Sequence, residues 1–372
     1  MNTAADIKKT EIDSPQSLNF LLVLLRFSGV FFPTLAPLLV DTRPEMLKAT
    51  PVVGLVGFLA IVGVLLFRQI AIYLVVFSWL TNCFAGILLC LLFTGFLHQP
   101  SVYLYYLFAV VLALAMTGTE FAGLFSAVRP DHVNQVRARL TTFNMAKVFG
   151  MAAGFLLACL LPGHSAAAVI SKYLVFFVGV TMFVLSVTSF RLWIRQYHHV
   201  RTHDRDNDER VLSRTCTGGI MIIVDLMLFS FWYAYIPYRL HSIYAVPTAV
   251  VGLGLAIQAC VHALSQPMWK RIAEKLHDFP AFCISWTGHL LLVIIITHGG
   301  FQKPTLLIPL FVTMGLVNSG TYITGGAVFY RGHFPSGRFS RIAFQQALSN
   351  VGKWCGASLA VWIISMMENG YL

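Results

Sequence analysis

Residues 70–96 have the sequence IAIYLVVFSWLTNCFAGILLCLLFTGF, a run without a charged side chain. A helix that crosses a bilayer needs about 20 mainly apolar residues, so this run alone predicts a membrane helix. Comparable runs recur along the chain and predict eleven spans. Their expected bounds are 19–40, 51–67, 70–96, 102–127, 139–162, 168–192, 214–236, 247–268, 278–298, 304–330 and 341–366.

The composition of the whole chain also indicates a membrane protein. Of its 372 residues, 57% are hydrophobic and 11% are charged, and the mean hydropathy is +0.74. Soluble domains carry about a quarter charged residues, so this chain lacks the polar surface that a water-facing fold needs. The net charge of +11 does not indicate nucleic-acid binding, because the basic residues form short clusters between the apolar runs. We expect an all-α, multi-pass protein of the inner cell membrane.

The basic residues predict how the helices are oriented. Cytoplasmic loops of membrane proteins are enriched in Lys and Arg. If the N-terminus is cytoplasmic, five of the 26 basic residues lie outside and three lie within spans, which leaves 18 on the cytoplasmic side. The outer five are Arg43, Lys48, Lys172, Arg239 and Lys303. Because the first apolar run has no small-residue cleavage site after it, we expect a retained helix rather than a signal peptide.

Charge patterning also divides the chain into parts. The segment 193–213 contains the mixed-charge run HDRDNDER at 203–210 and has no apolar period, which is typical of a cytoplasmic linker. The expected organisation is a cytoplasmic tail at 1–18, a six-helix bundle at 19–192, the linker at 193–213 and a five-helix bundle at 214–372.

An internal repeat supports this division. Arg139, Gly150 and Gly154 recur 202 residues later as Arg341, Gly352 and Gly356. In both copies a basic loop leads into a helix whose small residues permit close packing. The repeat predicts two parallel bundles related by an axis along the membrane normal. A copy of span 168–192 would fall at 370–394, so we expect the twelfth helix to be missing.

Three stretches resemble the major facilitator superfamily, and within it the melibiose-permease-like (glycoside-pentoside-hexuronide:cation symporter) branch. They are GRFSRIAFQQ at 337–346 with GKWCG at 352–356, SAVRPD at 126–131 with KVFG at 147–150, and PMWKRIAEK at 267–275. The resemblance implies a two-bundle fold whose first, fourth, seventh and tenth helices line a central cavity. It also implies a cytoplasmic gating loop that contains Arg271 and Glu274, and site lysines at Lys147 and Lys353. Melibiose-type sodium coupling is not implied, because span 51–67 lacks a carboxylate.

Five ionisable residues fall within the predicted spans: Arg26, Glu120, Lys147, Asp225 and Lys353. A charge at the centre of a membrane helix costs roughly 2.5–3.5 kcal/mol on insertion scales, so such groups usually face a cavity or a partner. At about 1.5 Å per residue, Glu120 and Lys147 lie at one depth and Asp225 and Lys353 at another. This predicts two ion pairs, which serve either transport or structure alone. Arg26 has no acidic neighbour at its depth by this reasoning, so it either holds a solute carboxylate or phosphate or snorkels to the interface.

Other polar groups within the spans are weaker candidates. Asn318 and Tyr322 on the tenth span, with Trp232, Tyr233 and Tyr235 on the seventh, offer hydrogen bonds and stacking faces, although aromatic residues near span ends also form interface belts. His262 is a candidate proton site. His289 is a weaker one, because the ninth helix of the superfamily usually faces lipid. The cysteines lack metal-ligand spacing and are expected to pack as small hydrophobes.

The sequence contains no HExxH, GxSxG, Walker or CxxC motif, so we expect neither an enzyme nor a cofactor or metal site. The prediction is a secondary active transporter that moves a small polar, anionic solute by alternating access, by symport with protons as one option. Two alternatives stay open: an exporter of a siderophore or drug-like compound on the same fold, and a non-transporting membrane receptor or assembly factor.

Overall fold

The computed structural model describes residues 16–40, 43–94, 96–97, 100–127, 133–162, 166–188, 212–298, 304–330 and 338–370. Within these ranges the chain forms eleven α-helices and one short π-helical turn. The helices are α2 (Gln16–Leu38), α3 (Pro44–Leu66), α4 (Arg68–Phe93), α5 (Val102–Ala127), α6 (Val133–Leu160), α7 (Ala166–Thr188), α9 (Leu212–Tyr238), α10 (Thr248–Leu276), α11 (Asp278–His298), α12 (Pro304–Tyr330) and α13 (Arg338–Glu368); the turn is η1 (Arg239–Ile243).

The eleven predicted spans correspond one to one with these helices. The expected bounds 278–298 and 304–330 match α11 and α12, and the shortest connections are single residues, Phe67 between α3 and α4 and His277 between α10 and α11. Three boundaries were wrong: α10 continues to Leu276, eight residues past the expected end, while α3 and α6 begin at Pro44 and Val133, seven and six residues before the expected starts. The predicted linker 193–213 lies almost wholly outside the described residues.

Nine helices of the described chain are long and apolar enough to cross a bilayer. The other two, α6 and α13, are just as long but less apolar, because they carry polar and basic side chains. Their position explains this composition. Helix α6 packs against α2 and α10, and α13 packs against α9 and α3. Both helices are therefore shielded by protein and need less apolar surface.

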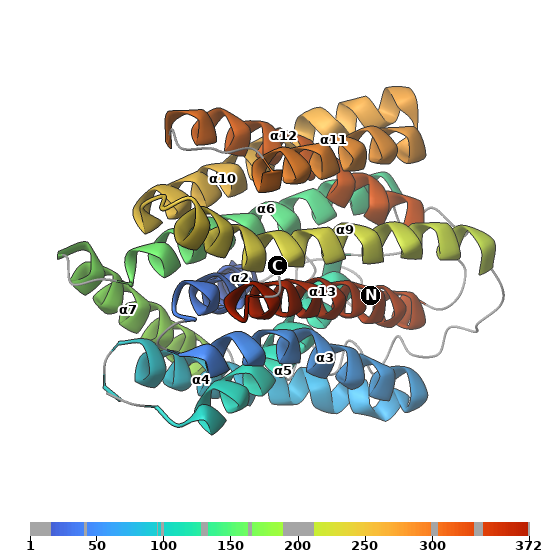
Figure 1. Cartoon of the computed structure of the whole chain (residues 1–372). Helices are drawn as coiled ribbons and strands as arrows, with labels where there is room; N and C mark the ends of the chain where they lie inside the picture. The colour runs from blue at the N-terminus through green and yellow to red at the C-terminus, as the bar shows by residue number, and fades with distance from the viewer. Residues whose placement is uncertain are drawn as a thin grey trace.

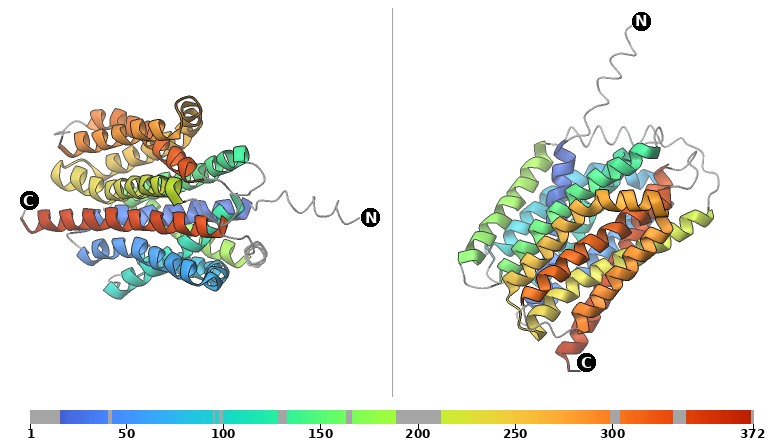
Figure 2. Two further views of the ribbon diagram at one scale, coloured as in Figure 1. Left: turned by 90° about the vertical axis from the view of Figure 1, so that its right-hand side faces the viewer. Right: turned by 90° about the horizontal axis from the view of Figure 1, so that it is seen from above.

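The helices form two groups with a layer between them. Figure 1 shows α3, α4 and α5 on one side, α10, α11 and α12 on the other, and α2, α6, α9 and α13 between. In Figure 2, α2 begins and α13 ends at opposite ends of the molecule, as expected for two helices that run in the same direction with an odd number of spans. The described chain is an all-α, multi-pass membrane protein.

The glycines of the predicted repeat make equivalent contacts in the two halves. A Cβ atom built on Gly154 of α6 would lie 2.6 Å from the carbonyl oxygen of Phe27 on α2. A Cβ built on Gly356 of α13, the repeat counterpart of Gly154, would lie directly against the carbonyl oxygen of Met227 on α9. Any side chain would therefore separate these backbones, and glycine permits the close approach. The repeat identified from the sequence is a repeat of helix packing.

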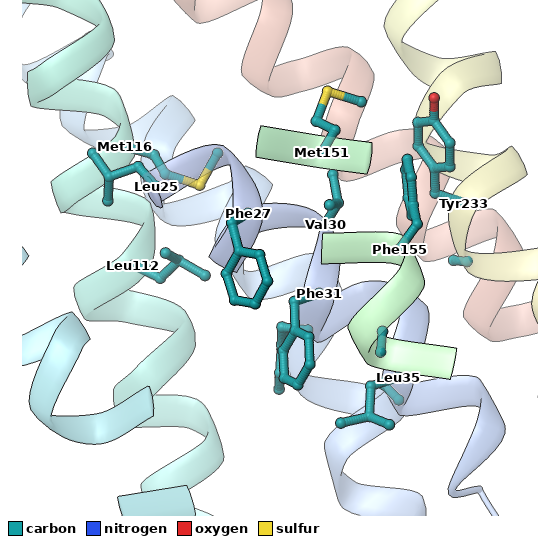
Figure 3. Close-up of a cluster of buried hydrophobic side chains, with 14 of the residues drawn as sticks. Leu25, Phe27, Val30, Phe31, Leu35, Leu112, Met116, Met151, Phe155 and Tyr233 are labelled. Carbon is teal, nitrogen blue, oxygen red and sulfur yellow. The ribbon is translucent and has the colours of Figure 1, made fainter. Parts of the chain in front are cut away.

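The apolar core passes from one group to the other through α2. Figure 3 shows Phe27 and Phe31 of α2 between Leu112 of α5 and Phe155 of α6. The ring of Phe155 packs on Tyr233 of α9, with centroids 4.3 Å apart. Helix α2 is thus buried on several sides, and an ionisable residue placed on it lies in the interior of the protein.

Candidate functional site

Glu120 is the centre of a buried charge cluster. It lies on α5 and is only 3% exposed. Its carboxylate contacts basic groups from three other helices: Arg26 Nη2 of α2 contacts Oε1, while Lys147 Nζ of α6 and Lys353 Nζ of α13 lie 3.6 Å and 3.9 Å from Oε2. We call these four residues the Glu120 cluster. Because α13 belongs to the second half of the chain, the cluster joins both halves.

Helix packing explains why these side chains converge. Gly150 of α6 lies directly against the carbonyl oxygen of Val23 on α2. Lys147 precedes this contact by three residues and Arg26 follows it by three, each about 4.5 Å along its helix axis. Both long side chains can therefore reach the same carboxylate of α5. In the other half, Lys353 follows Gly352, which packs against α9, so a close glycine contact fixes its position as well.

The cluster contains more basic groups than acidic ones. Three basic side chains surround one carboxylate, and the side chains of Glu120, Lys147, Arg26 and Lys353 are 4%, 6%, 11% and 17% exposed. At 3.6–3.9 Å a pair of unit charges attracts by about 4–5 kcal/mol at an effective dielectric constant of 20. Within the described part of the chain, Glu120 is the carboxylate that these three basic groups contact, and buried charge requires close counter-charges. The arrangement favours a second anion close to Glu120.

Polar groups beside the cluster add donors that lack acceptors. Asn350, one turn before Lys353, accepts a hydrogen bond from Lys353 Nζ at 3.4 Å. Its Nδ2 donor and the Nε donor of Arg26 are buried and have no hydrogen-bond partner among the described residues. A Cβ on Gly57 of α3 would lie 2.9 Å from Asn350 Nδ2, so glycine leaves room at this amide. A bound anion would supply the missing acceptors.

The ion pair predicted between Glu120 and Lys147 is confirmed. Two other expectations were wrong. Arg26 does have an acidic neighbour, which is Glu120, and Lys353 pairs with Glu120 rather than with Asp225. Assigning one partner to each charge caused the first error, since a carboxylate has two oxygens that each accept more than one donor. The second error arose because the pairing was predicted from depth along the helix axis, which does not specify the face on which a side chain lies.

Asp225 and Asn318 form a separate polar site within the second half. They are 4% and 1% exposed. Thr321 of α12 donates to the Asn318 backbone carbonyl at 2.8 Å and lies 3.3 Å from Asn318 Oδ1. Asp225 lies within hydrogen-bonding reach of the Thr321 hydroxyl. The side chain of Tyr322 lies outside the described part of the structure. The sequence reasoning missed Asn350 and Thr321, although each is three residues from a candidate on the same helix face.

The remaining candidates lie away from the Glu120 cluster. His262 and His289 are buried near each other on α10 and α11, so the expectation that His289 faces lipid was wrong. Arg271 and Glu274 lie on the exposed last turns of α10 rather than in a loop. The helix continues to Leu276 because residues 268–276 contain no proline or glycine that would end it.

The aromatic residues of α9 are buried instead of forming an interface belt. Trp232 is fully buried and donates a hydrogen bond to Gln258 Oε1 at 3.0 Å. Tyr235 is 8% exposed and stacks on Phe231. Tyr233 packs across to α6, as described above. Trp232 connects α9 to α10, and Tyr233 connects α9 to α6 of the first half.

Comparison with solved structures identifies the fold. The chain is similar to a bacterial homologue of the human lysosomal transporter Spinster, solved in an inward-facing and unoccupied conformation, with a TM-score of 0.57. The match covers 96% of this chain and 86% of the other, at 13% sequence identity. The fold is of the major facilitator type. Neither a protein-family model nor a curated protein sequence matches the chain.

The likeness confirms the predicted fold class, and membership of the superfamily and of its branch stays a prediction. At 13% identity it concerns the arrangement of helices, and fold by itself does not specify what a site binds. The chemistry of this chain must therefore be argued from its own side chains. The Glu120 cluster is the feature of the described residues that bears most directly on that question.

Proposed function

We propose that the protein is a secondary active transporter that moves a small polar, anionic solute across the inner cell membrane by alternating access. The observation that carries the proposal is the Glu120 cluster, in which three basic side chains from both halves of the chain surround one carboxylate. The N-terminus is proposed to be cytoplasmic, following the distribution of basic residues.

The chemistry of the cluster indicates a solute with a carboxylate or phosphate group. Arg26 offers a planar fork of donors that matches either group, and the two lysines act as point charges. Asn350 Nδ2 adds a neutral donor beside them. Glu120 contacts all three cations. An entering anion would share these cations, so Glu120 limits its affinity and permits its release.

The position of Lys353 links binding to the motion that alternating access requires. Its ion pair with Glu120 connects α13 of the second half to α5 of the first. If the halves rock against each other, this contact lengthens or breaks, as interfacial ion pairs do in other switching proteins. A solute anion between Lys353 and Arg26 would bridge the halves in its place.

Two other functions rank lower. An exporter of an uncharged, drug-like compound would not need a buried excess of basic groups, whereas an anionic siderophore would be compatible with them. A non-transporting receptor or assembly factor would be consistent with purely structural salt bridges. Membership of the melibiose-like branch stays a proposal that rests on the stretches at 126–150 and 337–356, and it does not extend to a glycoside substrate.

The test is transport by purified protein in liposomes with labelled organic acids and phosphate esters, under gradients applied in both directions. Hydrogen bonds to charged groups contribute about 1.5–3 kcal/mol, and each 1.4 kcal/mol is tenfold in affinity. Lys147→Ala and Lys353→Ala should therefore weaken apparent affinity by roughly 10- to 150-fold. Lys172→Ala is the matched control, because this lysine lies exposed on α7.

Membrane abundance of each variant is measured in parallel by quantitative immunoblotting. Unchanged flux in both lysine variants at normal abundance would assign the cluster to structure alone. If the folded wild-type protein moves none of the anions under any gradient, the transport proposal is wrong. Flux in one direction only would distinguish uptake from export.

A further inference from the structure

Asn350 lies between the Glu120 cluster and the surface on which α13 packs against α3. It is 3% exposed and precedes Lys353 by three residues, so the two side chains lie on the same face of α13. Lys353 Nζ donates a hydrogen bond to Asn350 Oδ1 at 3.4 Å and lies 3.9 Å from Glu120 Oε2. The ammonium group thus contacts one acceptor on its own helix and one on α5 of the other half.

The chemistry of the two groups determines which way the Asn350 amide points. An ammonium group can only donate, whereas an amide side chain has an oxygen that accepts and a nitrogen that donates. The Asn350 oxygen must therefore face Lys353, and the nitrogen is directed away from it. Asn350 Nδ2 is buried and has no hydrogen-bond partner in the described part of the chain. Whatever packs against this nitrogen determines whether the oxygen stays beside Lys353.

The first half of the chain packs against the nitrogen end of the amide. A Cβ atom built on Gly57 of α3 would lie 2.9 Å from Asn350 Nδ2 and 2.9 Å from Thr117 Oγ1 of α5. The amide nitrogen therefore packs on the bare backbone of α3, beside a hydroxyl group of the helix that carries Glu120. Any side chain at position 57 would push against the amide.

A second glycine keeps α3 and α13 in close contact at this level. Helices α3 and α13 pack side by side, although they belong to different halves (Figure 1). A Cβ atom on Gly54, one turn before Gly57, would lie 2.6 Å from the backbone nitrogen of Trp354. Trp354 directly follows Lys353. The turn of α13 that carries Asn350 and Lys353 therefore packs on the glycine face of α3, where small residues permit close approach.

We propose that Asn350 is a positioning residue whose amide, packed against Gly57, holds Lys353 Nζ beside Glu120, so that the anion site is complete only while α3 contacts α13. This inference rests on the proposed transport function. The terminal torsion of an asparagine side chain is soft, so without α3 the amide can turn and Lys353 loses an acceptor. A solute anion that binds Lys353 then favours the state in which these two helices touch.

The first test measures the interaction of Lys353 with Glu120 and does not depend on transport. A double-mutant cycle on the free energy of unfolding, with Lys353→Met and Glu120→Gln, is run in the wild type and in Asn350→Leu, which has a similar volume without the amide. We expect the coupling to fall by at least half in Asn350→Leu. Gln258→Leu is the control background, because it breaks a buried hydrogen bond to Trp232 elsewhere in the second half and should leave the coupling unchanged. A coupling in Asn350→Leu that equals or exceeds that of the wild type overturns the proposal.

The second test displaces the amide from the α3 side and measures solute affinity in liposomes with the labelled organic acids and phosphate esters. Gly57→Ala should weaken the apparent affinity about tenfold, the size of one hydrogen bond to a charged group. In a Lys353→Ala background the same change should weaken it at most threefold, because no ammonium group is left to position. Gly63→Ala on the same helix is the control and should be neutral, because its Cβ would lie 3.5 Å from Ile70 Cδ1, an ordinary contact.

The outcomes separate the positioning role from general packing and from transport itself. If Gly57→Ala weakens affinity equally in both backgrounds, or in neither, the contact does not act through Lys353 and the proposal is overturned. If Asn350→Leu does not fold, the unfolding cycle is run in Gly57→Ala, where the same fall in coupling is expected. If the coupling falls but the wild type transports no anion, the positioning role stands and the transport function fails.

Discussion

The ion pair between Lys353 and Glu120 permits a quantitative test of how strongly the two halves are joined. The pair is nearly buried, with Lys353 Nζ and Glu120 Oε2 3.9 Å apart. At an effective dielectric constant of 20 the gross attraction is about 4 kcal/mol. Desolvation of both groups opposes this attraction, so we expect a net coupling of about 1–3 kcal/mol. Coupling of this size corresponds to a factor of roughly 5–150.

The assay is a double-mutant cycle on the free energy of unfolding in mixed detergent micelles, with Lys353→Met, Glu120→Gln and the double variant. Methionine and glutamine retain most of the side-chain volume and remove the charge. Arg26 and Lys147 remain in all four proteins, so the cycle isolates the Lys353 contribution. We expect the double variant to be more stable than the sum of the single losses predicts.

The control cycle replaces Lys353→Met by Lys172→Met. Lys172 is exposed on α7, and distant sites usually add to within about 0.3–0.5 kcal/mol. If the Lys353 cycle is additive to the same degree, the pair does not hold the halves together. Rupture of this ion pair would then not be a step of alternating access.

Two further predictions concern packing and buried polar atoms. Gly352→Ala should destabilise the protein by about 1–3 kcal/mol, because the added methyl group would overlap the Ile223 carbonyl. Gly326→Ala is the control and should be neutral or stabilising, because open space surrounds Gly326. Equal thermal unfolding temperatures of the two variants would contradict the prediction. Trp232→Phe should cost about 1–3 kcal/mol by leaving the Gln258 side chain unpaired, and adding Gln258→Leu should recover part of the loss in the same assay.

The helices were predictable because the bilayer imposes a strong and local requirement. A membrane helix must satisfy its backbone hydrogen bonds internally and expose apolar side chains over about 20 residues. Both conditions are visible in a single stretch such as 278–298, whose predicted bounds match α11. The end of α10 was missed because polarity marks where a helix leaves the membrane, and α10 continues beyond that point through Arg271 and Glu274.

The candidate site was predictable in its members but not in its connections. Ionisable residues in apolar runs are rare enough that Arg26, Glu120, Lys147 and Lys353 could be selected from the sequence alone. The two additional polar groups, Asn350 and Thr321, have no such signal, since neutral polar residues are common in membrane helices.

The sequence by itself therefore determined that this is a multi-pass helical protein with a repeated glycine motif and a few interior charges, because each of these properties depends on residues close together in the chain. Only the tertiary structure decided which charges meet. Three basic side chains share Glu120, and Asp225 lies near Thr321 of α12 instead of pairing with Lys353. Such pairing depends on the rotation of each helix about its axis, which is set by close contacts such as those at Gly150 and Gly352 between helices far apart in sequence.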